Sequence, residues 1–151
     1  MSFLSHGPYR IRYELDGPAD APAYVLVNGL TQYAELWAAY RDALIARQFR
    51  VATFDLLGQG ESDKPALFIS QDDQVAALHC LIGELGEGPV FLSGISFGGL
   101  IALRYAIAHG ERLAGLVPMS CFAELPPQLF LLGNALRTGL ILGGTSYLQD
   151  L

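Results

Sequence analysis

The sequence predicts an α/β protein in which a mostly parallel β-sheet carries helices on both faces. Short β-branched segments alternate along the chain with longer helical patterns, as expected where helices connect parallel strands. Hydrophobic residues make up 52% of the chain and charged residues only 16%, which excludes a disordered polypeptide. A mean hydropathy of +0.34 agrees with a sheet buried on both sides, or with apolar surface that awaits a partner. A chain of 151 residues suggests one domain.

Five segments have the β-branched, apolar character of strands. The first alternates apolar and polar residues, and Gly17-Pro18 and Ala21-Pro22 mark a turn after it. The third leads into a loop rich in turn residues, 56–65. The expected strands are residues 9–15, 24–28, 51–55, 90–93 and 113–119.

Two helices are predicted from apolar spacing alone. Trp37, Tyr40 and Leu44 recur at i, i+3 and i+7, which predicts one face of a first helix. Residues 100–108 are apolar nearly all round, as expected of a helix buried against the sheet.

A further helix, between these two, is predicted with its two ends. Ser70 is the expected N-cap, and Asp72 and Asp73 are favourably placed near the positive end of the helix dipole. Gly86 and Gly88 are expected to end the helix. Its apolar stripe consists of Val75, Leu78, Leu81, Ile82 and Leu85.

A Gly-x-Ser-x-Gly pattern, formed by Gly94, Ser96 and Gly98, lies between an expected strand and the helix that follows it. In this context it indicates a nucleophile elbow, a sharp, strained turn whose glycines let neighbouring backbone approach. A serine hydroxyl needs a base to take its proton and donors to stabilise the oxyanion that forms. Ser96 is therefore the candidate catalytic nucleophile. The alternative is a plain turn with a capping serine.

The oxyanion is expected to be held by two backbone N–H groups. One belongs to Phe97, the residue after the nucleophile. The other belongs to the loop after the 24–28 strand, where Asn28 and Gly29 shape the turn and the N–H of Leu30 is the candidate donor. The alternative is that Asn28-Gly29 is merely a turn dipeptide.

Three motifs, at residues 25–29, 54–62 and 94–99, occur in an order that resembles the N-terminal half of α/β-hydrolase-fold enzymes. The resemblance covers roughly residues 9–119. It implies an α/β-hydrolase-type sheet, apparently truncated after the sixth strand. Residues 1–125 would be the N-terminal part of that domain, and 126–151 the start of a lid or of a following helical segment.

One departure from the family pattern points to a branch within it. Most such enzymes carry His-Gly where this chain has Asn28-Gly29. An Asn-Gly version, together with Asp72-Asp73, resembles the branch that contains the hydroxyacyloxyalkanoate synthase of rhamnolipid biosynthesis. That resemblance implies acyl-ester or acyl-thioester substrates with apolar chains.

The base for Ser96 is missing from its expected place. In this fold the triad runs Ser, then Asp or Glu, then His, but only His109 follows Ser96, and residues 97–108 contain no acid. His109 comes thirteen residues after Ser96, which along a helix is roughly 20 Å. A base must come within about 3 Å. His79 is expected to pack or to face solvent, and His6 to precede the sheet.

Other residues near the expected site are no better placed. Glu124 follows the last strand and could supply the acid, although a surface glutamate is the favoured alternative. Cys121 could be a second nucleophile, but without a recognisable base it is expected to be a small buried residue. The 113–119 strand would be a bare sheet edge. Either the natural protein continues past Leu151, or this edge pairs with a second copy.

The predicted function is therefore that of a serine-dependent hydrolase or acyltransferase acting on ester or thioester bonds of small apolar acyl substrates. Trp37 and Phe97 could be pocket walls, although helix core is favoured for Trp37. The alternative function is a catalytically inactive fragment, or a non-catalytic binding domain with the same fold, because the acid and the histidine of the triad are missing.

Composition excludes several other functions. The nine Lys and Arg do not cluster in a chain of net charge −6, so no nucleic-acid partner is expected. No metal or cofactor is expected, because the chain lacks a ligand cluster and a phosphate loop. Cys80 and Cys121, with no signal peptide, suggest reduced thiols in a cytoplasmic protein. The apolar stretch 129–144 contains Asn134 and Arg137 and is short of the ~20 residues a membrane span needs.

Overall fold

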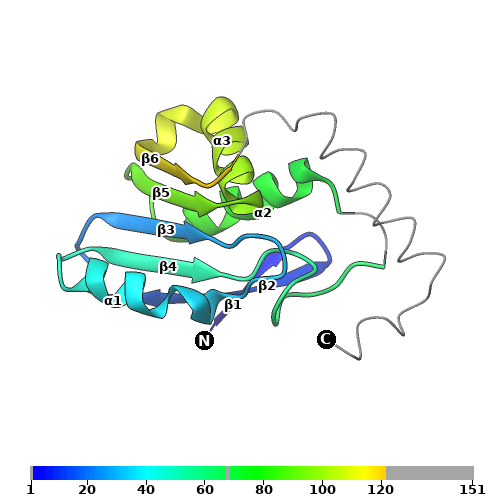
Figure 1. Ribbon diagram of the computed structural model, residues 1–151, viewed down its shortest axis with the longest axis horizontal. Helices are drawn as coiled ribbons and strands as arrows, with labels where there is room; N and C mark the ends of the chain where they lie inside the picture. Colours follow the sequence, from blue (N-terminus) through cyan, green and yellow to red (C-terminus); the bar gives the residue numbers. More distant parts are fainter. Residues whose placement is uncertain (1, 67–68, 122–151) are drawn as a thin grey trace. The chain divides into compact units, whose positions relative to one another are not determined.

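The computed structural model describes residues 2–66 and 69–121, which contain one six-stranded sheet (Figure 1). The strand order is β1-β2-β4-β3-β5-β6. Strands β4, β3, β5 and β6 are parallel, whereas β1, β2 and β4 pair antiparallel. The mostly parallel α/β class is confirmed. The strands are β1 (Ser2–His6), β2 (Tyr9–Asp16), β3 (Ala23–Val27), β4 (Arg50–Phe54), β5 (Val90–Ile95) and β6 (Leu113–Met119).

Strand β1 was not predicted from the sequence. Its five residues are of mixed character, and they become a strand by pairing with β2, which places Leu4 opposite Ile11 and His6 opposite Tyr9. Leu4 and Ile11 are both buried. Because the partner strand and not local composition decides this pairing, the expectation that His6 precedes the sheet was wrong: His6 ends its first strand.

The helices lie on both faces of the sheet, as predicted. Successive strand residues point to opposite faces. Val25 and Val27 pack in one cluster with residues of α2 and α3, while Leu26 between them packs with Trp37 on the other face. Figure 1 shows α1 in front of the sheet. The helical elements are η1 (Ala34–Trp37), α1 (Ala38–Ile45), α2 (Gln71–Glu84), α3 (Phe97–His109) and η2 (Gly110–Arg112).

Helix α2 begins where its capping residue predicted. The Ser70 hydroxyl accepts a hydrogen bond from the Asp73 N–H (3.1 Å), and the Asp73 carboxylate accepts one from the Ser70 N–H (2.8 Å). This capping box satisfies two N–H groups that would otherwise lack partners. Gly86, at a φ of +102°, lies just past the helix end, as expected. The helix buries Gln74, Val75, Ala77, Leu78, Leu81 and Ile82.

Of two expectations about buried helix faces, one was wrong and one is confirmed. Tyr40 is 59% exposed and touches Trp37 edge-on, with ring centroids 5.5 Å apart. Trp37 belongs to the tighter 3₁₀ turn before α1, so a count of 3.6 residues per turn does not place Trp37 and Tyr40 on one face. Helix α3 is buried against the sheet as expected, through Ile101, Ala102 and Tyr105, while Ile107 on its outer side is 87% exposed.

Strand β6 is one of the two edge strands of the sheet in the described ranges. It pairs with β5, none of its residues is fully buried, and Val117 is 47% exposed. Pairing of a second copy along this strand stays a prediction. Glu124, the apolar stretch 129–144 and the expected lid segment 126–151 lie outside the described residues.

Candidate active site

Ser96 occupies a strained turn between β5 and α3. Its backbone has φ 53° and ψ −117°, a conformation that costs a non-glycine residue about 1–3 kcal/mol. The Ser96 N–H donates to the carbonyl of Met119 at the end of β6 (2.9 Å), which holds the turn in place. The side chain is exposed and does not cap α3. The turn therefore presents the hydroxyl outward, the geometry that a nucleophile elbow requires.

The glycines on either side of Ser96 allow a close approach of backbone segments. A Cβ on Gly94 would collide with the carbonyl of Gly98, and a Cβ on Gly98 would collide with the carbonyls of Val27 and Asn28. The first turn of α3 therefore packs directly on the ends of β3 and β5. This contact brings the loop after β3 next to Ser96.

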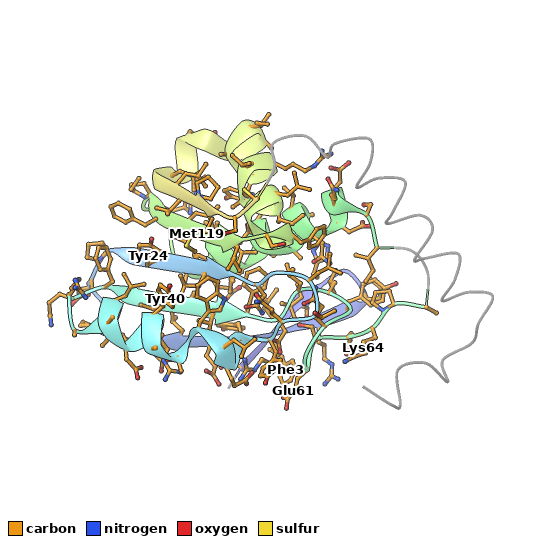
Figure 2. The ribbon with its side chains drawn as sticks, in the orientation of Figure 1. Phe3, Tyr24, Tyr40, Glu61, Lys64 and Met119 are labelled. Carbon is orange, nitrogen blue, oxygen red and sulfur yellow. The ribbon has the colours of Figure 1, made fainter. Side chains whose placement is uncertain are left out.

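Asn28 holds the start of that loop from within the core. Its side chain is fully buried, donates to the carbonyl of Phe54 (2.8 Å) and accepts from the indole N–H of Trp37 (2.6 Å). Trp37 is 5% exposed and packs with Leu26 on the α1 face, so it is helix core and not a pocket wall. Figure 2 shows two more side chains of this face, Tyr24 and Met119.

The two predicted oxyanion donors lie on neighbouring segments. Phe97 is the first residue of α3, a position whose N–H has no partner within its helix. The Leu30 N–H makes no hydrogen bond to any residue the structure describes, and the Leu30 side chain is 61% exposed. Gly29 directly precedes Leu30: its N–H donates to the side-chain oxygen of Gln32 (2.8 Å), and a Cβ there would be 3.3 Å from the carbonyl oxygen of Ile95.

The loop after β4 fastens this region to the rest of the sheet. The buried Asp55 carboxylate accepts from the N–H groups of Ala34 (2.8 Å) and Glu61 (2.9 Å). The side chain of Gln59, with its amide nitrogen turned inward, donates to the carbonyls of Gln32 (2.8 Å) and Gly29 (3.1 Å). Figure 2 labels Glu61 and Lys64 on this loop.

Arg12 is the residue of this region that sequence reasoning missed. It lies on β2, is 1% exposed, and donates to Glu14 (2.7 Å) and Glu35 (2.5 Å). Its Nε is 4.0 Å from the Asp55 carboxylate. An arginine among the apolar residues of a strand was the available signal, because a buried charge requires partners of opposite sign.

Two histidines stack at the far end of α3. The rings of His79 and His109 lie 4.1 Å apart, and Nδ1 of His79 is 3.2 Å from the hydroxyl of Tyr105. Partial burial holds the pKa of His79 below its ordinary value, and the charges of His109 and Arg112 lower it further. His109 ends α3, whereas Ser96 precedes its first residue, so roughly 20 Å of helix separates imidazole and hydroxyl.

The structure also shows the contacts of His6, the third histidine, and of Cys121, the second candidate nucleophile. Nδ1 of His6 lies 3.4 Å from Sγ of Cys80 on α2. Cys121 packs against the first turn of α3, where a Cβ on Gly99 would lie 2.7 Å from its Cβ. Cys121 is partly buried, in line with its predicted packing role.

Known proteins of several kinds are similar to this chain. A family model described as alpha/beta hydrolase fold matches residues 22–138. Lipase LipV of Mycobacterium tuberculosis is 35% identical over 121 residues, which are 80% of this chain and 43% of that protein. A haloalkane dehalogenase of Mycobacterium marinum is 34% identical over 115 residues, which are 75% of this chain and 39% of that protein.

A solved structure extends the likeness to three dimensions. A hydrolase from Pseudomonas aeruginosa PA01 aligns with a TM-score of 0.86 at 26% identity, over 99% of this chain and 55% of that one. The chain spans about two fifths of the length of the two curated relatives. In the described part of the chain, every helix is too short or too polar to span a bilayer.

Proposed function

The chain belongs to the alpha/beta hydrolase fold family, as its three motifs predicted, and we propose that it carries the nucleophile of a serine-dependent ester or thioester hydrolase or acyltransferase. The observation that carries the proposal is Ser96 itself. Ser96 is exposed, and its backbone has a positive φ that is strained for a residue other than glycine. The narrower resemblance to the hydroxyacyloxyalkanoate synthase branch stays a prediction.

In the proposed reaction, the Ser96 hydroxyl attacks the carbonyl carbon of an acyl ester or thioester while a base takes its proton. The carbonyl oxygen becomes an oxyanion and accepts hydrogen bonds from the N–H groups of Phe97 and Leu30. Collapse of the tetrahedral intermediate expels the alcohol or thiol, which takes the proton from the base, and leaves an acyl group on Ser96. Water completes a hydrolysis, and a second hydroxyl or thiol completes a transfer.

The base belongs, in this proposal, to a polypeptide segment other than these 151 residues. The chain contains three histidines. His79 and His109 stack at the end of α3 remote from Ser96, and His6 contacts Cys80, the neighbour of His79. None of the three can take the Ser96 proton from where it lies, so the histidine of the triad is assigned to that other segment.

An apolar acyl chain is the substrate that the surroundings of Ser96 favour. Leu30, which carries one proposed oxyanion donor, exposes most of its side chain. Phe97, which carries the other, is partly buried against the core. One relative is named as a lipase and another as a haloalkane dehalogenase, so the family alone does not select the bond that is broken.

A non-catalytic binding domain is the second candidate function. The observation that favours it is the position of the histidines. If Ser96 has no base, the elbow would remain as a structural turn, and the exposed apolar residues around it would bind a ligand without turnover.

The two functions are separated by supplying a base from solution. Free imidazole can take the serine proton, so we expect it to accelerate hydrolysis of p-nitrophenyl butyrate at least about tenfold more in the protein than in Ser96→Ala, which lacks the hydroxyl that imidazole would deprotonate. The measurement is p-nitrophenolate release against imidazole concentration.

Ser120→Ala is the matched control. Ser120 is also exposed at a positive φ (46°) and follows Met119, which bonds the elbow, but it is not on the elbow. This variant should keep the imidazole-dependent rate. Equal rates for the protein and Ser96→Ala at every imidazole concentration would reject the catalytic proposal and leave the binding domain.

A further inference from the structure

A histidine and a cysteine are in contact between β1 and α2, away from Ser96. Nδ1 of His6, the last residue of β1, is 3.4 Å from Sγ of Cys80, within hydrogen-bond distance for sulfur. Both residues are partly exposed, so a small reagent can reach the sulfur. A thiol next to an imidazole is the arrangement in which the imidazole can take the thiol proton and leave a nucleophilic thiolate.

A carboxylate on the same helix lies near this pair. Asp73 precedes Cys80 by seven residues, two turns of α2, so both lie on one side of the helix. Hydrogen bonds from Ser70 hold the pKa of Asp73 below its ordinary value, and the charge of His6 contributes in the same direction. The carboxylate of Asp73 is therefore a negative charge near the imidazole of His6.

The other cysteine offers a contrast within the same chain. Cys121 is also partly buried, but no imidazole contacts it within the described residues, and its neighbour is Gly99 at the start of α3. Cys80 adjoins His79, which stacks on His109 at the opposite end of α3. The ten residues from Gly99 to His109 span about 15 Å of helix, too far for a disulfide.

We propose that Cys80 is a modification site, activated by His6, that reacts with peroxides. The thiol proton passes to Nδ1 of His6, and the sulfur attacks one peroxide oxygen. The O–O bond breaks, the leaving oxygen takes a proton, and Cys80 is oxidised by two electrons to a sulfenic acid while the peroxide is reduced. Because Cys121 is out of reach, the sulfenic acid is open to an external thiol. This proposal does not depend on the function of Ser96.

The test compares the rates at which peroxide oxidises the two cysteines in the same sample. The protein is treated with hydrogen peroxide at neutral pH, sulfenic acids are trapped with dimedone, and the labelled peptides are quantified by mass spectrometry over time. Cys80 is expected to be labelled at least about tenfold faster than Cys121, because a positioned base contributes a factor of about 10²–10⁴ at full efficiency. In urea-unfolded protein the two rates should converge.

Two variants decide whether His6 is the cause. His6→Gln should slow labelling of Cys80 about tenfold and leave Cys121 unchanged, whereas His79→Gln, next to Cys80 in sequence but bonded to Tyr105, should leave both rates unchanged. Equal rates for the two cysteines in the native protein, or an unchanged Cys80 rate in a folded His6→Gln variant, would overturn the proposal.

Discussion

The two ends of α3 carry complementary chemistry and do not meet. At its start, Ser96 exposes a hydroxyl on a strained backbone, and Gly98 packs directly on the backbone of β3. At its end, His109 stacks on His79 beside Tyr105. The candidate nucleophile and an imidazole thus lie at opposite ends of one helix, about 20 Å apart. The residue types of a catalytic pair do not make a site unless the fold brings them within hydrogen-bond reach.

The two ends also differ in how tightly they are held. The start of α3 is enclosed by main-chain atoms of β3 and β5, which cannot shift without moving the sheet. In the last turns, the ring of His109 stacks on that of His79, and Ile107 is 87% exposed. A strained conformation such as that of Ser96 persists only where surrounding contacts over-determine it, and the tighter end of the helix provides them.

The largest effect on stability is expected from adding a side chain to Gly98, at the start of α3. In Gly98→Ala the new methyl would meet the backbone carbonyls of Val27 and Asn28, so the free energy of unfolding should fall by about 3 kcal/mol or more. Urea denaturation followed by circular dichroism measures it. Gly83→Ala, in α2 with open space around it, should instead stabilise by up to about 1 kcal/mol. Similar losses in both variants would contradict the difference in packing.

A smaller effect is expected from relieving the strain at the elbow. Glycine adopts a positive φ freely, so Ser96→Gly should raise the free energy of unfolding by about 1 kcal/mol, the relief being partly offset by the greater entropy of glycine in the unfolded chain. Ser96→Ala retains the strained φ and should leave stability nearly unchanged. Both variants should lose the imidazole-dependent ester hydrolysis. A Ser96→Gly protein less stable than Ser96→Ala would show that the turn is not strained.

The smallest effect on stability is expected from the protonation of His79, which packs at the end of α3. The pKa of His79 is lowered from its ordinary 6.5, so the unfolded chain binds a proton more readily than the folded one. Above pH 6.5, His79 is neutral in both the folded and the unfolded chain and the full free energy of unfolding is present. As the pH falls from 6.5 toward the lower pKa of His79 in the folded protein, the free energy of unfolding decreases. The loss should be slight, because the side chain is largely exposed. Urea midpoints between pH 5 and 8 should fall more on acidification in the protein than in His79→Gln.

Several features of the fold and the site followed from residues close together in the chain. The N-cap of α2 at Ser70, four of its five stripe residues, five of the six strands and the strand–turn–helix context of Ser96 were all predicted. Each rests on spacing within one element, where hydrogen-bond and side-chain periods are set by the backbone itself. The remoteness of His109 also followed, because the rise of a helix converts sequence separation into distance.

Other features depended on partners far away in the sequence. Strand β1 exists because it pairs with β2, and that pairing is also what sets His6 against Cys80. Arg12 is buried because Glu35 and Asp55, from other segments, compensate its charge.

The sequence by itself determined the α/β class, the family motifs in their order, and Ser96 as the residue on the turn. The tertiary structure alone decided that Asn28 bonds Trp37 within the core, that Tyr40 faces outward, and that the two cysteines have different neighbours. The physical reason is the range of the interactions. Local periodicity and capping act over a few residues, whereas burial, ion pairing and thiol chemistry depend on which distant segments the sheet and its helices bring together.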